Sequence, residues 1–364
     1  MIPDITNPTF LTKLIKTPEK VIDKLNLVYT NDHKLTIRRY KKGEDFIYKL
    51  NGEILSVQKD IDRIKKLVIP PAWKNVRIAV LDNGHLQATG RDLKKRKQYR
   101  YHPLWQKIRS QTKFYKMYDF GKQLPKIRKK VDTDLEQKGW PKSKVLALII
   151  RLMEETHIRI GNEQYAKRNK TYGLSTMRTR HVNIQKDKTK FEFVGKKGKR
   201  HSVTLRNKKL TRLINKCEEI PGWELFQYYD NDGIKHSVES GMVNNYLHEI
   251  GGELFTAKDF RTWGATTIVF EQLMEKGVTN SKRKIHENIL AAYDKAAESL
   301  GNTRNVCKKY YVHPAIIAHY ANGSIKSYFD KVDSYNGDTA YFSNTELAIL
   351  ELLKNYRPEF LNQK

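Results

Sequence analysis

The chain of 364 residues carries 69 Lys and Arg against 40 Asp and Glu, which gives a formal net charge of +29. A surplus of this size indicates a polyanionic partner. Nucleic acid is favoured, because neutralising its phosphates releases counterions and gives strong, salt-sensitive affinity. On charge alone, a ribosomal or membrane-surface role is the alternative.

The rest of the composition argues against zinc-binding, disulfide-rich and membrane-spanning proteins. The two cysteines, Cys217 and Cys307, form no CxxC motif and no zinc quartet, which indicates a reducing compartment. The first residues lack a basic segment followed by an apolar one, and no run reaches the roughly 18 apolar residues that a membrane span requires. We therefore expect a soluble cytoplasmic protein, nucleoid-associated if bacterial.

The length favours two domains, and the patterns place them at residues 1–100 and 101–364. The smaller domain is predicted to be α+β, with an antiparallel sheet. Its hairpin is signalled by two alternating runs that flank Gly43 and by Asn51-Gly52, which follows them. A helical stretch is predicted at residues 5–30, a hairpin at 35–55 and a short helix at 61–68. Two strands are predicted at residues 76–80 and 85–89.

A basic segment follows at residues 91–109. It carries eight Lys and Arg against one Asp, interleaved with Tyr99, Tyr101 and Trp105. Cations neutralise phosphates while aromatic rings pack on sugars or bases, so an extended segment of this kind could close over a duplex. A solvated linker is the alternative.

The larger domain is predicted to be mainly helical with one embedded β-hairpin, so the whole chain is α+β. A buried helix at residues 144–160 ends near Arg159, and strands at 191–194 and 201–205 flank a cationic tip that includes Lys196. The other predicted helices lie at residues 208–219, 240–253, 258–275, 281–299, 304–320 and 344–355.

Cations on structured elements and a tyrosine pair suggest a site for phosphoryl transfer. Lys258 and Arg261 share one helical face, and Tyr310 and Tyr311 follow two lysines. A phenol with a pKa near ~10 needs nearby positive charge to act as a nucleophile. Two arginines can clamp a phosphate, and a lysine can protonate the departing oxygen. Judged singly, each cation has a structural alternative as a helix cap, an exposed turn or a solvated face.

Together these residues carry a resemblance to a known family. Four motifs follow one another along the chain: Arg-Ile-Gly-Asn-Glu (159–163), Phe-Val-Gly-Lys-Lys-Gly-Lys (193–199), Lys-Asp-Phe-Arg-Thr-Trp-Gly-Ala-Thr (258–266) and Leu-Gly-Asn-Thr with Lys-Lys-Tyr-Tyr (300–311). In this order they resemble the type IB DNA topoisomerases, in their compact poxvirus-like and bacterial form. Further similarity at residues 68–73 and 84–92 extends it over roughly residues 30 to 320. The resemblance implies relaxation of supercoiled duplex DNA through a 3′-phosphotyrosyl intermediate, without ATP, metal or other cofactor.

The resemblance also implies roles for individual residues. Arg159 and Arg261 would clamp the scissile phosphate, and Lys196 would protonate the leaving 5′ oxygen. Lys258 would assist either Arg261 or that proton transfer. Tyr311, rather than Tyr310, would be the nucleophile. Asn302 stands where the poxvirus enzymes have His, and it can still donate a hydrogen bond to phosphate. The residues expected to contact DNA are Gln87, Thr89, Arg91, Lys97, Tyr99, Tyr101 and Tyr165.

The expected partner is double-stranded DNA, around which a monomer would close with its two domains. Two alternatives stay open. Tyrosine recombinases share much of the constellation but typically have His three residues before the second arginine, where this chain has Lys258. A noncatalytic basic nucleic-acid-binding protein would explain the charge without any role for Tyr311.

Overall fold

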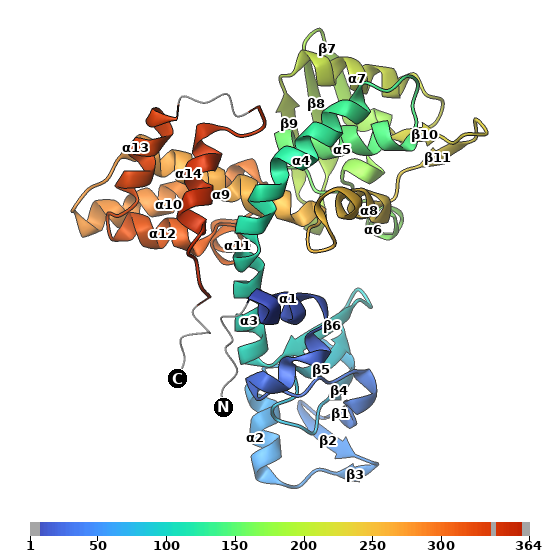
Figure 1. The fold of residues 1–364 in the computed structure, drawn as a ribbon. Helices are drawn as coiled ribbons and strands as arrows, with labels where there is room; N and C mark the ends of the chain where they lie inside the picture. The colour runs from blue at the N-terminus through green and yellow to red at the C-terminus, as the bar shows by residue number, and fades with distance from the viewer. Residues whose placement is uncertain (1–7, 336–339, 359–364) are drawn as a thin grey trace. The chain divides into compact units, whose positions relative to one another are not determined.

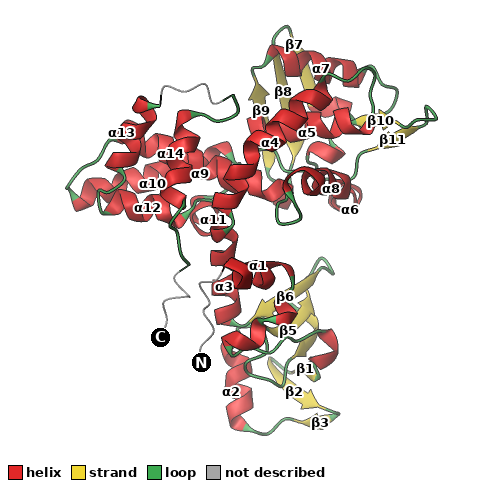
Figure 2. Ribbon diagram, viewed as in Figure 1, coloured by secondary structure: helices red, strands yellow, loops and turns green. Residues whose placement is uncertain are grey.

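The computed structural model describes residues 8–335 and 340–358. The chain divides into two compact units (Figures 1 and 2), the first holding the described residues up to Lys113 and the second Phe114–Tyr356. We call them the N-terminal unit and the catalytic unit. The domain boundary predicted between residues 100 and 101 falls inside strand β6, Lys97–Tyr101.

The N-terminal unit is built on a six-stranded sheet with the order β3-β2-β1-β4-β5-β6, in which neighbouring strands are antiparallel. Helix α2, which ends at Lys66 before Pro70-Pro71, packs through Ile64 on the sheet residues Ile37, Val76 and Ile78. The bounds are β1 Ile37–Lys42, β2 Asp45–Leu50, β3 Glu53–Ile54, β4 Lys74–Ile78, β5 Leu86–Arg91, α1 Pro8–Lys16, α2 Gln58–Lys66 and α3 Pro103–Tyr115.

Two sequence predictions for this unit are wrong. The helical stretch at residues 5–30 is interrupted, because α1 ends at Lys16 and Pro18 opens the first of two short 3₁₀ turns, Pro18–Lys20 and Ile22–Leu25. The basic segment 91–109 is not an extended linker. Its first half completes the sheet as β6, and Pro103 begins α3, since proline suits the first turn of a helix.

The catalytic unit is mainly helical, with a three-stranded sheet of order β7-β8-β9 and a two-stranded ribbon, β10-β11. The predicted hairpin is confirmed as β8 and β9, and β7 was not predicted. The bounds are α4 Met117–Leu135, α5 Lys142–Thr156, α6 Glu163–Asn169, β7 Val182–Gln185, β8 Lys188–Val194, β9 Arg200–Leu205, α7 Lys208–Glu218, β10 Gln227–Tyr229, β11 Lys235–Ser237, α8 Ser240–Gly251, α9 Ala257–Lys276, α10 Lys282–Ser299, α11 Arg304–Tyr310, α12 Pro314–Ala321, α13 Lys326–Ser334 and α14 Asn344–Leu353.

The helix predicted at residues 304–320 is broken into α11 and α12. Pro314 takes the first position of α12, and the His313 side chain caps that helix by accepting a hydrogen bond from the N–H of Ala315 at 3.2 Å. A proline cannot continue a preceding helix, because it lacks the N–H and its ring displaces the previous turn. Tyr311 therefore lies at the end of a helix rather than in its middle.

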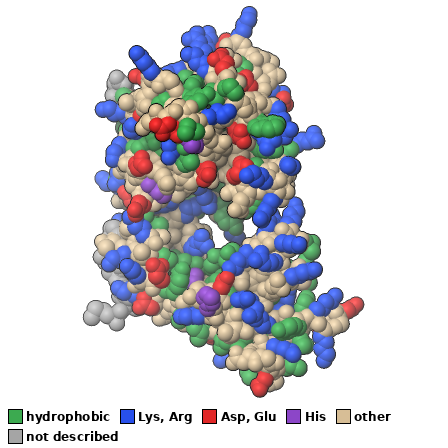
Figure 3. Space-filling model, turned by 90° about the vertical axis from the view of Figure 1, so that its right-hand side faces the viewer, with side chains coloured by type: hydrophobic (Ala, Val, Ile, Leu, Met, Phe, Trp, Pro, Cys, Tyr) green, Lys and Arg blue, Asp and Glu red, His purple; other side chains and the backbone are tan. Residues whose placement is uncertain are grey.

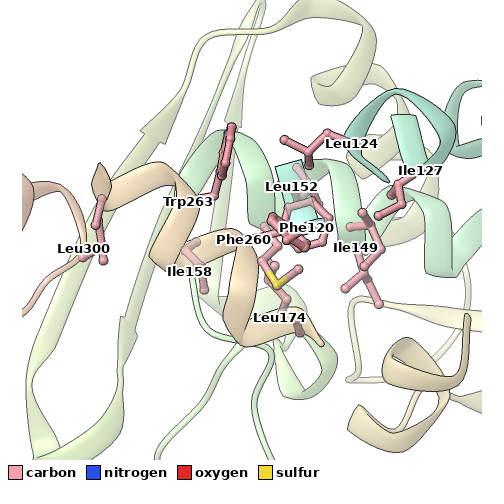
Figure 4. Close-up of a cluster of buried hydrophobic side chains, with 14 of the residues drawn as sticks. Phe120, Leu124, Ile127, Ile149, Leu152, Ile158, Leu174, Phe260, Trp263 and Leu300 are labelled. Carbon is pink, nitrogen blue, oxygen red and sulfur yellow. The ribbon is translucent and has the colours of Figure 1, made fainter. Parts of the chain in front are cut away.

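One hydrophobic core holds the loops that carry the polar residues of interest (Figure 4). Phe120 of α4 packs edge to face against Phe260 and Trp263 of α9, with ring centroids 5.1 and 6.2 Å apart. Ile158 and Leu300 belong to the same core and lie one and two residues from Arg159 and Asn302. Burial of these apolar neighbours fixes where the two loops lie.

Candidate active site and DNA-binding surface

Arg159 lies in the loop that follows α5. The sequence predicted it at the end of the helix, but α5 ends at Thr156, because His157 takes a left-handed conformation with φ 53°. The carbonyl of Arg159 accepts a hydrogen bond from the N–H of Leu174 at 2.8 Å. A Cβ atom on Gly173 would lie 2.4 Å from the same carbonyl oxygen. Only glycine allows the two backbone segments to approach this closely.

Lys196 lies at the tip of the hairpin formed by β8 and β9. The next two residues have positive φ angles, so the turn is tight and presents Lys196 at the surface. Desolvation of the ammonium group lowers the pKa of Lys196, and the nearby charges of Arg159 and Lys258 lower it further, while Tyr311 acts in the opposite direction. A lysine with a lowered pKa gives up its proton more readily, as a general acid must.

Arg261 is the most buried cation of the group. Its side chain is 3% exposed and donates hydrogen bonds to the carbonyls of His157 and Leu300, the latter at 2.9 Å. Burial, followed by the charge of Arg159, lowers the pKa of Arg261 to about 10, so the guanidinium stays charged at neutral pH. Lys258, one turn earlier on α9, is exposed.

Asn302 connects the turn before α11 to Arg159. Its Oδ1 accepts a hydrogen bond from Arg159 Nη2 at 2.6 Å, and its backbone carbonyl accepts one from Lys199 Nζ at 3.3 Å. The amide nitrogen Nδ2 is buried and makes no full hydrogen bond within residues 8–335 and 340–358, although the Asn302 side chain lies near enough to the Cys307 thiol to affect its ionisation. That nitrogen can donate to an oxygen of a bound phosphate.

Tyr311 lies beside these cations and Tyr310 points elsewhere. The guanidinium carbon of Arg261 lies 5.3 Å from the centroid of the half-buried Tyr311 ring. Tyr310 is 43% exposed, and the ammonium nitrogen of Lys309 lies 5.5 Å from its ring centroid. The two tyrosines therefore have different surroundings although they are adjacent in the sequence.

The cations change the ionisation of Tyr311. Burial alone raises the pKa of its phenol, but Arg261, Arg159 and Lys258 together hold the pKa below its ordinary value. Arg159, Lys196 and Arg261 also line one pocket. The structure thus brings together the six residues that the resemblance singled out, from five separate segments of the chain.

A row of polar side chains crosses the sheet of the N-terminal unit. Neighbouring members are direct cross-strand partners on β2, β1, β4, β5 and β6, namely Lys49, Arg38, Arg77, Thr89 and Tyr99. Three cations opposed in this way repel one another unless an anion lies over them. Several members of the row line a hollow of about 670 Å³.

Sequence reasoning missed three residues of this row, namely Lys49, Arg38 and Arg77. The alternation of residues 35–40 could have placed Arg38 on the face opposite the buried Ile37. Its alignment with Arg77 depends on strand pairing between segments almost forty residues apart.

Two of the residues predicted to contact DNA are buried in the free protein. Gln87 is 2% exposed, its amide nitrogen donates to backbone carbonyls that include Leu81 (3.0 Å) and Gly84 (2.7 Å), and its oxygen accepts from Arg63. These bonds hold the loop before β5. Thr89 is 4% exposed but lines the hollow.

The other predicted residues of this unit are on its surface. The rings of Tyr99 and Tyr101 stack with centroids 5.9 Å apart and an interplanar angle of 12°. Arg91 and Lys97 line the hollow, where Lys97 forms an ion pair with Asp32. A DNA phosphate would have to compete with that carboxylate.

Tyr165 is the predicted DNA contact of the catalytic unit. It is 52% exposed on α6, whose first turn is capped by Asn162. Lys and Arg side chains are spread over the visible face of both units (Figure 3), as the net charge requires. Within the described ranges, no helix is long and apolar enough to cross a membrane, and no cluster of three His, Cys, Asp or Glu side chains could hold a metal ion.

A half-buried tyrosine beside two hydrogen-bonded arginines and two exposed lysines, in a mainly helical unit, is the arrangement expected of enzymes that use tyrosine to attack a phosphodiester. Comparison with known proteins identifies the family. Residues 102–336 match the model of the eukaryotic DNA topoisomerase I catalytic core, and residues 45–92 match the N-terminal domain of bacterial DNA topoisomerase IB.

Viral relatives agree with these matches. The chain is 36% identical to DNA topoisomerase 1B of Acanthamoeba polyphaga mimivirus over 336 residues, which cover 90% of this chain and 97% of the relative. It is 26% identical to DNA topoisomerase 1 of rabbit fibroma virus, over 65% of this chain and 72% of that protein, and 23% identical to vaccinia virus DNA topoisomerase 1B, over 63% and 70%. The chain belongs to the type IB DNA topoisomerases, enzymes that relax supercoiled duplex DNA by transient cleavage of one strand.

Proposed function

We propose that Tyr311 is the nucleophile of this topoisomerase. Its phenol loses a proton and its oxygen attacks the phosphorus of a phosphodiester in duplex DNA. The bond from phosphorus to the 5′ oxygen breaks, leaving a 3′-phosphotyrosyl link and a free 5′-hydroxyl. The energy of the broken bond is kept in the new ester, so rejoining by the reverse reaction requires no ATP.

The cations act on the charge that develops in this step. Arg159 and Arg261 bind the nonbridging oxygens, and Asn302 donates its amide N–H to one of them. Lys196 protonates the departing 5′ oxygen and takes the proton back during rejoining, while Lys258 supports the phenolate of Tyr311. The observation that supports these roles most directly is the position of Tyr311, whose ring centroid lies 5.3 Å from the guanidinium carbon of Arg261, where Arg261, Arg159 and Lys258 hold the pKa of the phenol below its ordinary value.

The row of cations on the N-terminal sheet is proposed to follow a DNA backbone. Arg38, Arg77 and Lys97 would neutralise phosphates, and Tyr99 and Tyr101 would pack against sugars or bases. Tyr165 would contact a phosphate near the cleavage site. We propose that a monomer holds the duplex with both units, and that the protein acts in the cytoplasm, at the nucleoid if the host is bacterial. Light scattering of the complex and imaging of a tagged protein test these two statements.

A plasmid assay tests the catalytic proposal. Purified protein is incubated with negatively supercoiled plasmid in EDTA without ATP, denatured rapidly, and digested to find the peptide linked to DNA. Relaxed plasmid together with a DNA-linked peptide containing Tyr311 is the expected result. Joining between different DNA molecules would instead indicate a recombinase, and a DNA link at another residue would overturn the assignment of the nucleophile.

A further inference from the structure

His201 occupies a confined position beside the candidate site. It lies on β9 directly opposite Phe193 on β8, and the two rings stack with centroids 5.0 Å apart and an interplanar angle of 9°. Glycines flank the ring at two edges. A Cβ atom on Gly195 would lie 2.6 Å from Cδ2 of His201, and one on Gly301 would lie 2.3 Å from Cε1. The imidazole thus fills the space that side chains at both glycines would need.

The ring connects two segments that carry proposed catalytic groups. Gly195 directly precedes Lys196 at the hairpin tip, and Gly301 directly precedes Asn302. The hydrogen bond from Lys199 Nζ to the carbonyl of Asn302 crosses between the same two segments at 3.3 Å. His201 therefore controls how closely the tip can approach the turn before α11.

The surroundings of His201 favour a neutral ring that acts by packing. Burial lowers its pKa, and the charges of Arg159, Lys199 and Arg261 lower it further. A neutral imidazole needs no counter-ion and packs against backbone as a flat, rigid spacer. The ring also lines the pocket that Arg159 and Lys196 share.

We propose that His201 is a positioning residue that keeps the hairpin tip at a fixed distance from the Asn302 turn. It thereby directs Lys196 at the leaving 5′ oxygen, an inference that rests on the role proposed for Lys196. A residue with this task affects the step that needs the lysine proton. It has little effect on DNA affinity or on the attack by Tyr311.

Two cleavage substrates separate this role from general support of the fold. In one the scissile phosphate has its normal bridging 5′ oxygen, and in the other that atom is sulfur, which departs as a thiolate with its electron pair and needs no proton. We expect His201→Ala to slow single-turnover cleavage of the oxygen substrate by about 10- to 100-fold, because small misplacements of catalytic groups have effects of about that size. The sulfur substrate should be cleaved at nearly the wild-type rate.

His236 provides a matched control. It lies opposite Tyr228 on the β10-β11 ribbon, and its ring stacks on that tyrosine with centroids 5.3 Å apart, as His201 does on Phe193. His236→Ala should leave both cleavage rates unchanged. A similar loss in both histidine variants would contradict a specific role for His201.

Gly195→Ala tests the packing itself. Gly195 has φ −97°, which any residue can adopt, so the added methyl group conflicts only with the neighbouring rings. We expect Gly195→Ala alone to slow cleavage of the oxygen substrate, and to add little in a His201→Ala background, since the ring it displaces is then absent. Full additivity of the two substitutions would overturn the packing argument.

Lys196→Ala separates failure of this inference from failure of the proposed function. If sulfur restores cleavage by Lys196→Ala but not by His201→Ala, the role of Lys196 stands and the inference for His201 is wrong. If sulfur restores neither variant, the role of Lys196 fails and the inference fails with it. Restoration of both variants supports both.

Discussion

The guanidinium of Arg261 is held beside the Tyr311 ring, with its central carbon 5.3 Å from the ring centroid. Hydrogen bonds to the carbonyls of His157 and Leu300 fix the arginine in place before any substrate arrives. A charge that is already in position stabilises a developing phenolate or phosphorane without reorganisation. The proposed attack on phosphorus therefore depends on the contact between Arg261 and Tyr311.

Tyr311→Phe should abolish plasmid relaxation and the covalent DNA adduct, because phenylalanine lacks the phenol oxygen that is proposed to attack the phosphorus. DNA affinity, measured by fluorescence anisotropy, should stay within a few-fold of wild type, since the ring remains. Tyr310→Phe is the matched control and should relax plasmid normally. Relaxation by Tyr311→Phe would refute the assignment.

Lys258→Met should shift the pH dependence of cleavage. Lys258 is one of the cations that hold the pKa of Tyr311 below its usual value. Removing it raises that pKa, so the limb of the rate profile that rises with pH should move to higher pH in single-turnover assays. Lys276→Met, at the other end of α9, should leave the profile in place. Equal shifts in both variants would exclude a local charge effect.

Arg38→Ala with Arg77→Ala should weaken DNA binding and reduce its dependence on salt. Each phosphate contact removed should lower the slope of log K against log salt concentration by about 0.9. The slope is measured by titrating a labelled duplex at several salt concentrations. Lys59→Ala, on the helix that packs on the opposite face of the sheet, serves as control. An unchanged slope in the double variant would remove the sheet from the DNA path.

Gly173→Ala should impair cleavage by moving the loop of Arg159. The new methyl group would lie 2.4 Å from the Arg159 carbonyl oxygen and 2.5 Å from the backbone nitrogen of Gly161, and neither atom belongs to a flexible side chain. Gly241→Ala, where a Cβ atom meets nothing within 4 Å, should be active. Circular dichroism of both variants distinguishes a displaced loop from an unfolded protein.

Glu346→Gln should destabilise the catalytic unit. Glu346 of α14 is 6% exposed, forms two hydrogen bonds with Arg128 at 2.7 and 2.8 Å, and accepts one from Trp263 at 2.8 Å. Leaving a buried charge with no partner typically costs about 3 to 5 kcal/mol, and the loss here should be smaller because Arg128 keeps Glu154 as an ion-pair partner at 2.6 Å. Denaturant unfolding measures the loss.

A surface pair gives the comparison for Glu346. Glu351 forms an ion pair with Lys331 in which both side chains are about two-fifths exposed. Glu351→Gln should change the free energy of unfolding by less than about 1 kcal/mol, as exposed pairs usually do. Equal effects of the two substitutions would show that the buried network adds nothing.

Short motifs in the sequence identified the candidate site because each lies on one local turn or helix face. Arg159, Lys196, Arg261 and Tyr311 could be named from motif order, although their convergence depends on packing between distant segments. Local reasoning failed where proline or composition changed the pattern. Apolar spacing alone predicted one helix where Pro314 divides it in two. The helices α3 and α4 were not predicted, because their many basic residues obscure the spacing of the apolar residues that they bury.

The row Lys49, Arg38 and Arg77 has a consequence for the free enzyme. Repulsion among adjacent cations opposes folding of the N-terminal sheet until a polyanion covers them. Neutralising Arg38 and Arg77 should therefore raise the melting temperature of the unliganded protein while it weakens DNA binding. The charges proposed to bind DNA thus make the free sheet less stable than neutral residues at the same positions would.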